Sequence, residues 1–139
     1  MRIKLDSGAV MPTYATVGSA GLDLCANEDA VIPAGGWRLV RTGVHFEIPV
    51  GFVGLLFPRS GNALKRGLTF ENCVGVIDSD YRGDVGAEIR NDMDCSQTVR
   101  RGDKIAQMVF ARCEQFPLEM VDELDETERG EGGFGSTGR

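Results

Sequence analysis

The sequence predicts an all-β fold, a distorted jelly roll of barrel or sandwich type with one short helix and a flexible C-terminal tail. First, apolar residues alternate with polar ones, as at Val44, Phe46 and Ile48, and this period of two is typical of half-buried strands. Second, 19 Gly and five Pro are spread over 139 residues, which favours many turns and few long helices. Third, the apolar segments are short and nearly regularly spaced, which indicates a sandwich or jelly roll.

Apolar or alternating runs give the expected strands, and segments rich in Gly or Pro at 33–36, 49–51, 81–83 and 101–103 give the turns between them. The one expected helix covers 60–66, about two turns, with the Ser60 side chain capping its first turn. The expected strands are 2–5, 22–26, 30–32, 37–40, 44–48, 52–57, 68–77, 85–89, 105–110 and 118–121.

Length and composition indicate one domain followed by a tail. A chain of 139 residues has the commonest size for a single core, and its 42% hydrophobic residues can fill that core. After Leu124 the apolar pattern stops, and five of the eleven residues in 129–139 are Gly. We therefore expect a domain over 1–124 and a tail over 125–139, a segment whose alternative interpretation is an ordinary disordered terminus.

The charge balance excludes several classes of partner. Fifteen Lys and Arg against 21 Asp and Glu give a formal net charge of -6, so no broad field attracts a nucleic acid polymer or an anionic membrane. No window approaches the roughly 18 apolar residues of a membrane span, and the N-terminus lacks a hydrophobic signal core. These features predict a cytoplasmic protein without a membrane partner.

The cysteines and the single histidine do not form a zinc motif. The four cysteines are far apart in sequence, with no Cys-x-x-Cys pair. We expect them to be buried thiols. His45 lies on the polar side of its alternating strand, so we expect it at the surface. The cysteines are Cys25, Cys73, Cys95 and Cys113.

Two segments in the first half of the chain combine glycine with charged or polar groups. In 19–26, Asp23 lies between two leucines on the polar side of a strand, and a solvated carboxylate is the alternative to a functional one. In 58–67, a strand ends at proline and Arg59, Ser60 and Gly61 follow at the expected helix start. A guanidinium, a hydroxyl and unpaired amides at one place favour an anion such as phosphate, and a simple capped turn is the alternative.

The segment 72–86 indicates a β-hairpin with its turn around Tyr81. Reflection about that residue pairs Val76 with Gly86, and a glycine at that position lets a planar group approach the backbone and be recognised by N–H and C=O groups. Tyr81 and Asp78 flank this expected pocket. Asp78 is a candidate general base, although acidic residues near a turn also serve turn geometry and solubility.

Two later segments add polar groups. Gln107, within 102–108, lies among apolar neighbours, so its amide requires hydrogen-bond partners and could contact phosphate. In 129–139, glycines expose backbone amides beside two hydroxyls and Arg129, which is the chemistry of a phosphate-binding loop without a Walker sequence. Phe134 in the same tail could stack on a base.

These five segments, in this order and at these spacings, resemble the five motifs of the trimeric deoxyuridine triphosphatase (dUTP pyrophosphatase) family. The resemblance extends from about residue 19 to the C-terminus. Its most specific parts are Gly-Val-Ile-Asp at 75–78 with Asp-Tyr-Arg-Gly at 80–83, and Gly-Phe-Gly-Ser-Thr-Gly at 133–138. Three residues depart from the family pattern, namely Asn62, Glu88 and Arg90.

The resemblance implies a Mg²⁺-assisted hydrolysis of dUTP to dUMP and pyrophosphate, which limits uracil in DNA and supplies dUMP for thymidylate synthesis. It also implies a homotrimer whose active sites are shared between subunits and closed by the C-terminal tail. Asp78 would activate the water that attacks the α-phosphorus, Asp23 would hold Mg²⁺ through water, and Tyr81 would pack on the deoxyribose. The other implied contacts are Arg59, Ser60, Gly61, Gln107, Arg129, Ser136 and Thr137 for phosphate, Asn72, Gly75, Val76, Ile77, Gly86 and Phe134 for uracil, and Gly135 within the substrate-binding tail.

Two other functions remain as alternatives on the same fold. A dCTP deaminase needs a carboxylate that shuttles protons beside the exocyclic amine, whereas this hairpin has the Asp78 and Tyr81 pattern of the hydrolase. A non-enzymatic nucleotide-sensing regulator would need a surface for a partner, and the sequence contains no inserted segment to provide one. Assays with dCTP and dUTP separate these alternatives from the hydrolase.

Overall fold

In the computed structural model, which describes residues 1–133, strands dominate and one short helix is present. The all-β jelly-roll fold with a short helix is therefore confirmed. The elements are β1 (Arg2–Leu5), β2 (Thr13–Tyr14), β3 (Leu22–Cys25), β4 (Ala30–Ile32), β5 (Trp37–Arg41), β6 (Val44–Glu47), β7 (Phe52–Pro58), α1 (Ser60–Arg66), β8 (Leu68–Phe70), β9 (Gly75–Ile77), β10 (Gly86–Asn91), β11 (Gln97–Val99) and β12 (Lys104–Arg112).

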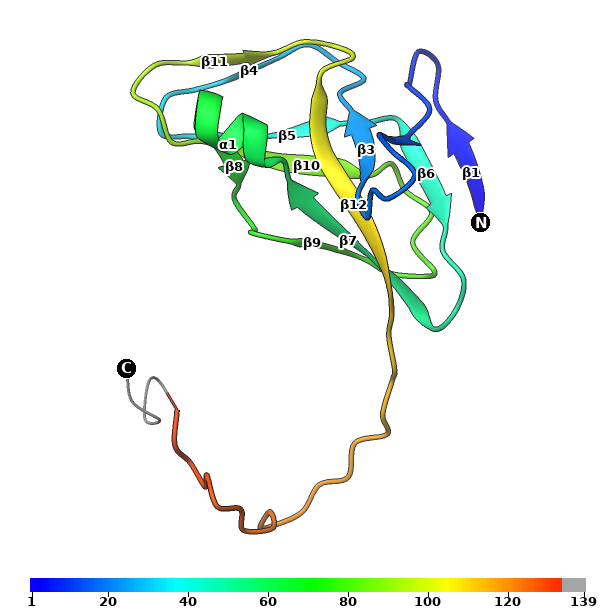
Figure 1. The fold of residues 1–139 in the computed structure, drawn as a ribbon, viewed down its shortest axis with the longest axis vertical. Helices are drawn as coiled ribbons and strands as arrows, with labels where there is room; N and C mark the ends of the chain where they lie inside the picture. The colour runs from blue at the N-terminus through cyan, green and yellow to red at the C-terminus, as the bar shows by residue number, and fades with distance from the viewer. Residues whose placement is uncertain (134–139) are drawn as a thin grey trace.

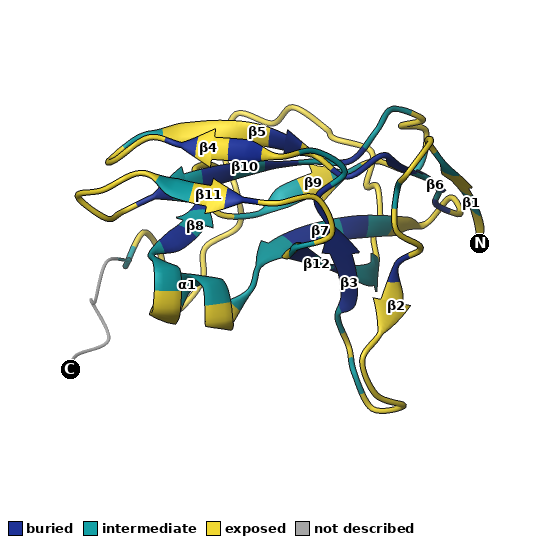
Figure 2. Ribbon diagram, turned by 90° about the horizontal axis from the view of Figure 1, so that it is seen from above, coloured by how far each residue is buried: buried dark blue, intermediate teal, exposed yellow. Residues whose placement is uncertain are grey.

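The strands pair antiparallel in sheets that form two layers. One layer is the five-stranded sheet β2-β3-β12-β7-β9, and the other contains β5-β10-β8 with the pair β4-β11. Figure 2 shows β4, β5, β10 and β11 on one side and β3, β7 and β12 on the other, with buried residues in strands of both sides. The pair β1-β6 lies at one end.

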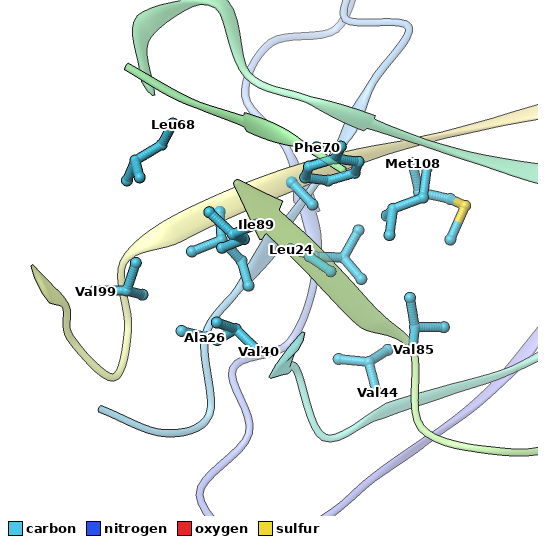
Figure 3. Close-up of a cluster of buried hydrophobic side chains, with 14 of the residues drawn as sticks. Leu24, Ala26, Val40, Val44, Leu68, Phe70, Val85, Ile89, Val99 and Met108 are labelled. Carbon is cyan, nitrogen blue, oxygen red and sulfur yellow. The ribbon is translucent and has the colours of Figure 1, made fainter. Parts of the chain in front are cut away.

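The core fills the space between these layers. Alternate residues of each strand point inward, so Leu24 of β3 and Met108 of β12 meet Val40 of β5 and Ile89 of β10 in one apolar cluster (Figure 3). The four side chains are almost completely buried. A core of this kind holds the strands rigidly, so polar residues at the strand ends have fixed positions.

Most expected strands are present, but the run 68–77 is divided. β8 ends at Phe70 and β9 begins at Gly75, with a turn between them in which Cys73 has a left-handed φ of 61°. A non-glycine residue rarely adopts this conformation, so the break could not be predicted from the residue types. The short strands β2 and β11 were not expected, because segments of two or three residues show no measurable alternation.

The expected strand at 118–121 is absent. After β12 ends at Arg112, the described residues to 133 contain no strand or helix and extend away from the sheets (Figure 1). Leu118 is 98% exposed and Met120 is 99% exposed. The apolar residues of 118–121 therefore do not form a strand that packs on the core of this chain. No helix in residues 1–133 is long and apolar enough to cross a membrane.

The helix α1 has the expected bounds but not the expected cap. Arg59, in an extended conformation, is the N-cap, and no side chain caps the helix. Ser60 is instead the first helical residue. Gly67 ends the helix with a φ of 60°, and its N–H donates to the Ala63 carbonyl, as is typical of a left-handed C-terminal glycine.

The expectation that all four cysteines are buried is wrong. Only Cys25, on β3, is buried, whereas Cys73, Cys95 and Cys113 are exposed and none of the four forms a disulfide. The three exposed cysteines lie in turns or just after a strand, where no alternation determines which side faces the core.

His45 is partly buried, although we expected it at the surface. Its Nδ1 lies 2.9 Å from the Arg82 carbonyl oxygen, and its Nε2 lies 3.1 Å from Asp6 Oδ2 without the alignment of a hydrogen bond. The Arg82 carbonyl and the Asp6 carboxylate favour the protonated ring, and this raises the pKa of His45 above its usual value. The side chain therefore links β6 to two loops.

This pKa shift predicts how stability depends on pH. Because the folded-state pKa is raised, the contribution of His45 to the free energy of unfolding is fully present below the unfolded pKa of about 6.5 and is lost as pH rises through the folded pKa. We expect His45→Gln to lower the melting temperature more at about pH 5.5 than at about pH 8.5. Thermal melts of both proteins at the two pH values check this. An equal difference at both would contradict it.

Candidate active site

A polar cavity of about 400 Å³ lies between β3, β12 and the start of α1. The register explains why these residues meet: β12 runs between β3 and β7, so Gln107 lies opposite both Asp23 and Phe57. The strand β7 then leads directly into Arg59. The residues that line this polar cavity are Ala15, Ser19, Ala20, Gly21, Asp23, Arg59, Ser60, Gly61 and Gln107.

Asp23 is the centre of a charge cluster in the polar cavity. Its side chain is only 9% exposed, with Lys104 Nζ 2.7 Å from Oδ2 and Arg59 Nε 3.1 Å from Oδ1. A buried carboxylate is stable only when it is paired in this way. The cluster contains two cations for one anion, so it retains positive charge that favours an anionic ligand.

Gln107 has a partner that determines its orientation. Its Nε2 donates to the Pro58 carbonyl at 3.0 Å, which satisfies the expectation that a part-buried amide needs a partner. A Cβ built on Gly21 would lie 2.6 Å from Gln107 Oε1. Gly21 must therefore remain a glycine for the Gln107 amide to occupy this wall of the polar cavity.

A second cavity, of about 390 Å³, surrounds the segment 72–86. We call it the hairpin cavity. It brings together the expected uracil and sugar residues with both ends of the segment. Its lining consists of Leu39, Arg41, Asn72, Gly75, Val76, Ile77, Asp78, Tyr81, Asp84, Val85, Gly86 and Glu88.

The expected pairing of Val76 with Gly86 is wrong. Val76, in β9, pairs with Leu55 of β7, and Gly86, in β10, pairs with Arg41 of β5. The two strands belong to different layers, and the described residues show no backbone hydrogen bond between them. The segment is thus a splayed hairpin, in which the two strands diverge. Both strands line the hairpin cavity, and they do not form backbone hydrogen bonds with each other within residues 1–133.

Tyr81 and Asp78 both lie in the wall of the hairpin cavity. Tyr81 is 41% exposed, its hydroxyl donates to the Asp84 carbonyl at 3.0 Å, and its N–H donates to the Asp78 carbonyl at 3.2 Å. The ring lies against Gly83, where a Cβ would collide with the hydroxyl. Within residues 1–133 the exposed carboxylate of Asp78 makes no hydrogen bond or ion pair, so it can accept a proton from a ligand or water.

The structure does not unite all the expected site residues. Among residues 1–133, none lines both cavities, so the residues expected to bind phosphate and those expected to bind uracil are separate in the single chain. Arg129 lines neither cavity, and its Nε donates to the Gly132 carbonyl at 2.7 Å. Phe134, Gly135, Ser136 and Thr137 lie outside the described residues.

Sequence reasoning missed one charged residue beside the polar cavity. Lys104 pairs with Asp23 across a shift in the register between Lys104 and Ala106. An irregularity of this kind redirects side chains and cannot be deduced from alternation. The only available signal was the position of Lys104 in the same turn-to-strand segment as Gln107.

The cavities offer few protein ligands for a metal. Within residues 1–133 no group of three or more His, Cys, Asp or Glu side chains could hold a metal ion. Asp23 is one buried carboxylate beside an anion-favouring surface, and a carboxylate has lone pairs left after two hydrogen bonds. This arrangement fits a hydrated Mg²⁺ that is held mainly by phosphate oxygens, which is the usual mode for this ion.

Comparison with known proteins gives the same family as the motifs. A family model described as dUTPase matches residues 7–138. The deoxyuridine 5'-triphosphate nucleotidohydrolase of Corynebacterium efficiens is 47% identical over 138 residues, which cover 99% of this chain and 76% of that protein. The enzyme of the same name from Caulobacter vibrioides is 50% identical over 132 residues, covering 92% and 85% respectively.

Solved structures agree with this. The dUTPase of Staphylococcus bacteriophage 80alpha with dUpNHpp has a TM-score of 0.93 at 31% identity and covers 99% of this chain and 98% of its own. A mutant dUTPase from phage phi11 of S. aureus, described for the coordination of a structural Mg(II) ion, has a TM-score of 0.82 at 27% identity, covering 90% and 98%. The chain belongs to the dUTPase family, whose members are dUTP hydrolases of jelly-roll fold.

Proposed function

We propose that this protein hydrolyses dUTP to dUMP and pyrophosphate, with Asp78 as the base that activates the attacking water. The observation that carries this proposal is the position of Asp78 in the wall of the hairpin cavity, where its carboxylate makes no hydrogen bond or ion pair with residues 1–133. A general base must be able to reach the water that attacks the α-phosphorus of a nucleotide bound in this cavity. Because water attacks the phosphorus directly, no covalent nucleophile from the protein is needed.

Recognition of uracil and deoxyribose follows from the hairpin cavity. The backbone of Gly75, Val76 and Ile77, with Asn72 beside it and Gly86 opposite, presents donors and acceptors to a planar base. A narrow cavity of this kind excludes thymine by the volume of its methyl group. The ring of Tyr81 would pack on the sugar and leave no room for a 2′-hydroxyl.

Phosphate recognition follows from the polar cavity. Arg59, Ser60, Gly61 and Gln107 offer a guanidinium, a hydroxyl, an amide N–H and a carboxamide. Charge that develops on phosphate oxygens is stabilised by donors positioned in this way. Asp23 would hold Mg²⁺ through its water ligands, and the bound ion supplies neutralisation of the phosphate charge.

A complete site requires more than one chain in this proposal. Since the two cavities share no lining residue, we infer that a homotrimer places the hairpin cavity of one subunit beside the polar cavity of another. Residues 125–139 would close over the nucleotide, with Arg129, Ser136 and Thr137 contacting phosphate, Phe134 covering uracil and Gly135 allowing the close approach. Sedimentation or light scattering checks the trimer.

A pyrophosphate-release assay across dUTP, dTTP, dCTP and UTP tests the function. We expect turnover of dUTP with Mg²⁺, strong discrimination against the other three, and loss of turnover with a chelator. Ammonia release from dCTP would instead indicate a deaminase, and binding of dUTP without release of pyrophosphate would indicate a sensing role.

Replacement of Tyr81 by alanine tests the sugar contact. Without the ring, the cavity has space for a 2′-hydroxyl, so we expect Tyr81→Ala to reduce the preference for dUTP over UTP by roughly 10-fold or more. The measurement is the ratio of kcat/KM for the two nucleotides. An unchanged ratio would show that another residue reads the sugar.

A further inference from the structure

A buried hydroxyl lies behind the part of the wall that carries Tyr81. Thr42 follows β5 and is completely buried, and it does not line either cavity. Its Oγ1 donates to the Val85 carbonyl at 2.6 Å and lies 3.3 Å from Asp84 Oδ1. A buried hydroxyl destabilises the fold unless it is hydrogen-bonded, so these contacts determine where Asp84 and Val85 can lie.

Main-chain bonds strengthen the same junction. Thr42 N–H donates to the Val85 carbonyl at 3.2 Å, and Val85 N–H donates to the Val44 carbonyl at 2.9 Å. Val44 N–H is shared between Thr42 Oγ1 and Asp84 Oδ1, at 3.2 Å each. The side chains of Thr42 and Asp84 therefore satisfy the same amide, which connects the turn before β6 to the segment before β10.

The turn that holds Thr42 is itself anchored. Gly43 has a φ of 67°, a conformation that favours glycine, and its carbonyl accepts from Asp6 N–H at 2.8 Å. Asp84 is thus held against a part of the protein that is fixed independently of the hairpin. The Asp84 carbonyl in turn accepts the hydroxyl of Tyr81 at 3.0 Å.

We propose that Thr42 is a positioning residue for selection of the sugar. Its hydroxyl donates to the Val85 carbonyl and shares the Val44 N–H with the Asp84 carboxylate, which fixes the backbone around Asp84. The Asp84 carbonyl in turn accepts the hydroxyl of Tyr81, a residue that is 41% exposed. The inference rests on the proposed function, in which that ring packs on deoxyribose. Exclusion of the 2′-hydroxyl requires a rigid wall. A more mobile Tyr81 therefore lowers the preference for dUTP over UTP more than it lowers the turnover of dUTP.

Thr42→Val tests the inference, because valine has nearly the same shape and lacks the hydroxyl. We expect the kcat/KM ratio of dUTP to UTP to fall about 5- to 10-fold, the effect of about one lost hydrogen bond. Thr42→Ser keeps the hydroxyl and should retain the wild-type ratio. A Thr42→Val protein that melts as a cooperative unit and keeps the wild-type ratio would overturn the proposal.

A double-mutant cycle of Thr42 and Tyr81, read out as the dUTP to UTP ratio, gives a result that a general loss of stability would not reproduce. Tyr81→Phe keeps the ring and removes only the hydrogen bond to Asp84, so we expect the same loss of discrimination. The double variant should be no worse than the poorer single variant, because both changes break one chain of contacts. Additive losses, or an unchanged ratio in Tyr81→Phe, would overturn the proposal.

Tyr81→Phe still tests the proposal if Thr42→Val does not fold, because Tyr81 is exposed and its substitution does not alter the core. The proposed function has a separate test. A folded wild-type protein that released no pyrophosphate from dUTP would contradict that function, whereas active variants with unaltered selectivity would contradict only the role of Thr42.

Discussion

Asp78→Asn is expected to lower kcat for dUTP by about 10²- to 10⁴-fold, the usual contribution of a general base. Asparagine has nearly the same shape as aspartate, but it cannot accept the proton of the attacking water. The Asp78 side chain makes no hydrogen bond or ion pair within residues 1–133, so the substitution removes no structural contact. Binding of dUpNHpp, measured by calorimetry, should weaken little.

Asp80→Asn is the matched control for this variant. Asp80 lies in the same turn and is exposed, but it lines neither the polar cavity nor the hairpin cavity. The two variants make the same change in charge at nearly the same place. We expect Asp80→Asn to retain most of the turnover. A loss of less than 10-fold in Asp78→Asn, or an equal loss in both variants, would be incompatible with Asp78 as the base.

The strands could be predicted from the sequence where alternation was long enough to measure. Val44 and Phe46 of β6 are buried, while His45 and Glu47, which alternate with them, are more exposed, as a period of two requires. Alternation cannot report a two-residue strand such as β2. Nor can it report contacts of a polar side chain with distant loops, which explains why His45 is less exposed than expected.

The parts of the site that depend on local sequence were predictable, and those that depend on register were not. Arg59, Ser60 and Gly61 are adjacent in sequence and line one cavity. The ion pair of Asp23 with Lys104 joins residues 81 positions apart and depends on an irregular register in β12. Only the structure could place that lysine.

The splayed hairpin shows the same limit. Reflection about Tyr81 brought Val76 and Gly86 together, and both line one cavity. It also assigned a hydrogen-bonded ladder to two strands that pair elsewhere. Each strand pairs instead within its own layer, β9 over three residues with β7 and β10 over five residues with β5. In the proposed function this separation of β9 from β10 is required, because backbone groups that are not paired between the two strands remain available to a nucleobase.

Removal of residues 130–139 is expected to leave the fold intact and to reduce dUTP turnover by roughly 10²-fold or more, because phosphate donors and closure over the substrate would be lost. Within residues 1–133 the last strand ends at Arg112, and the buried residues of the core lie between 22 and 108. The melting temperature of the truncated protein should therefore match that of the wild type. Undiminished turnover would contradict a role of the tail in catalysis.

Mixing two inactive proteins then tests whether the tail of one subunit completes the site of another. In Asp78→Asn chains the base is missing, and in chains without 130–139 the tail is missing, so a site built from a single chain is always defective. If each site takes Asp78 and the tail from different subunits, random reassembly at equal concentrations makes roughly a quarter of the sites complete, because each contribution is intact half of the time. We expect turnover to recover toward that fraction. Mixed trimers verified by mass spectrometry that recover none would show that base and tail come from the same chain, and the exchange of tails between subunits would be contradicted.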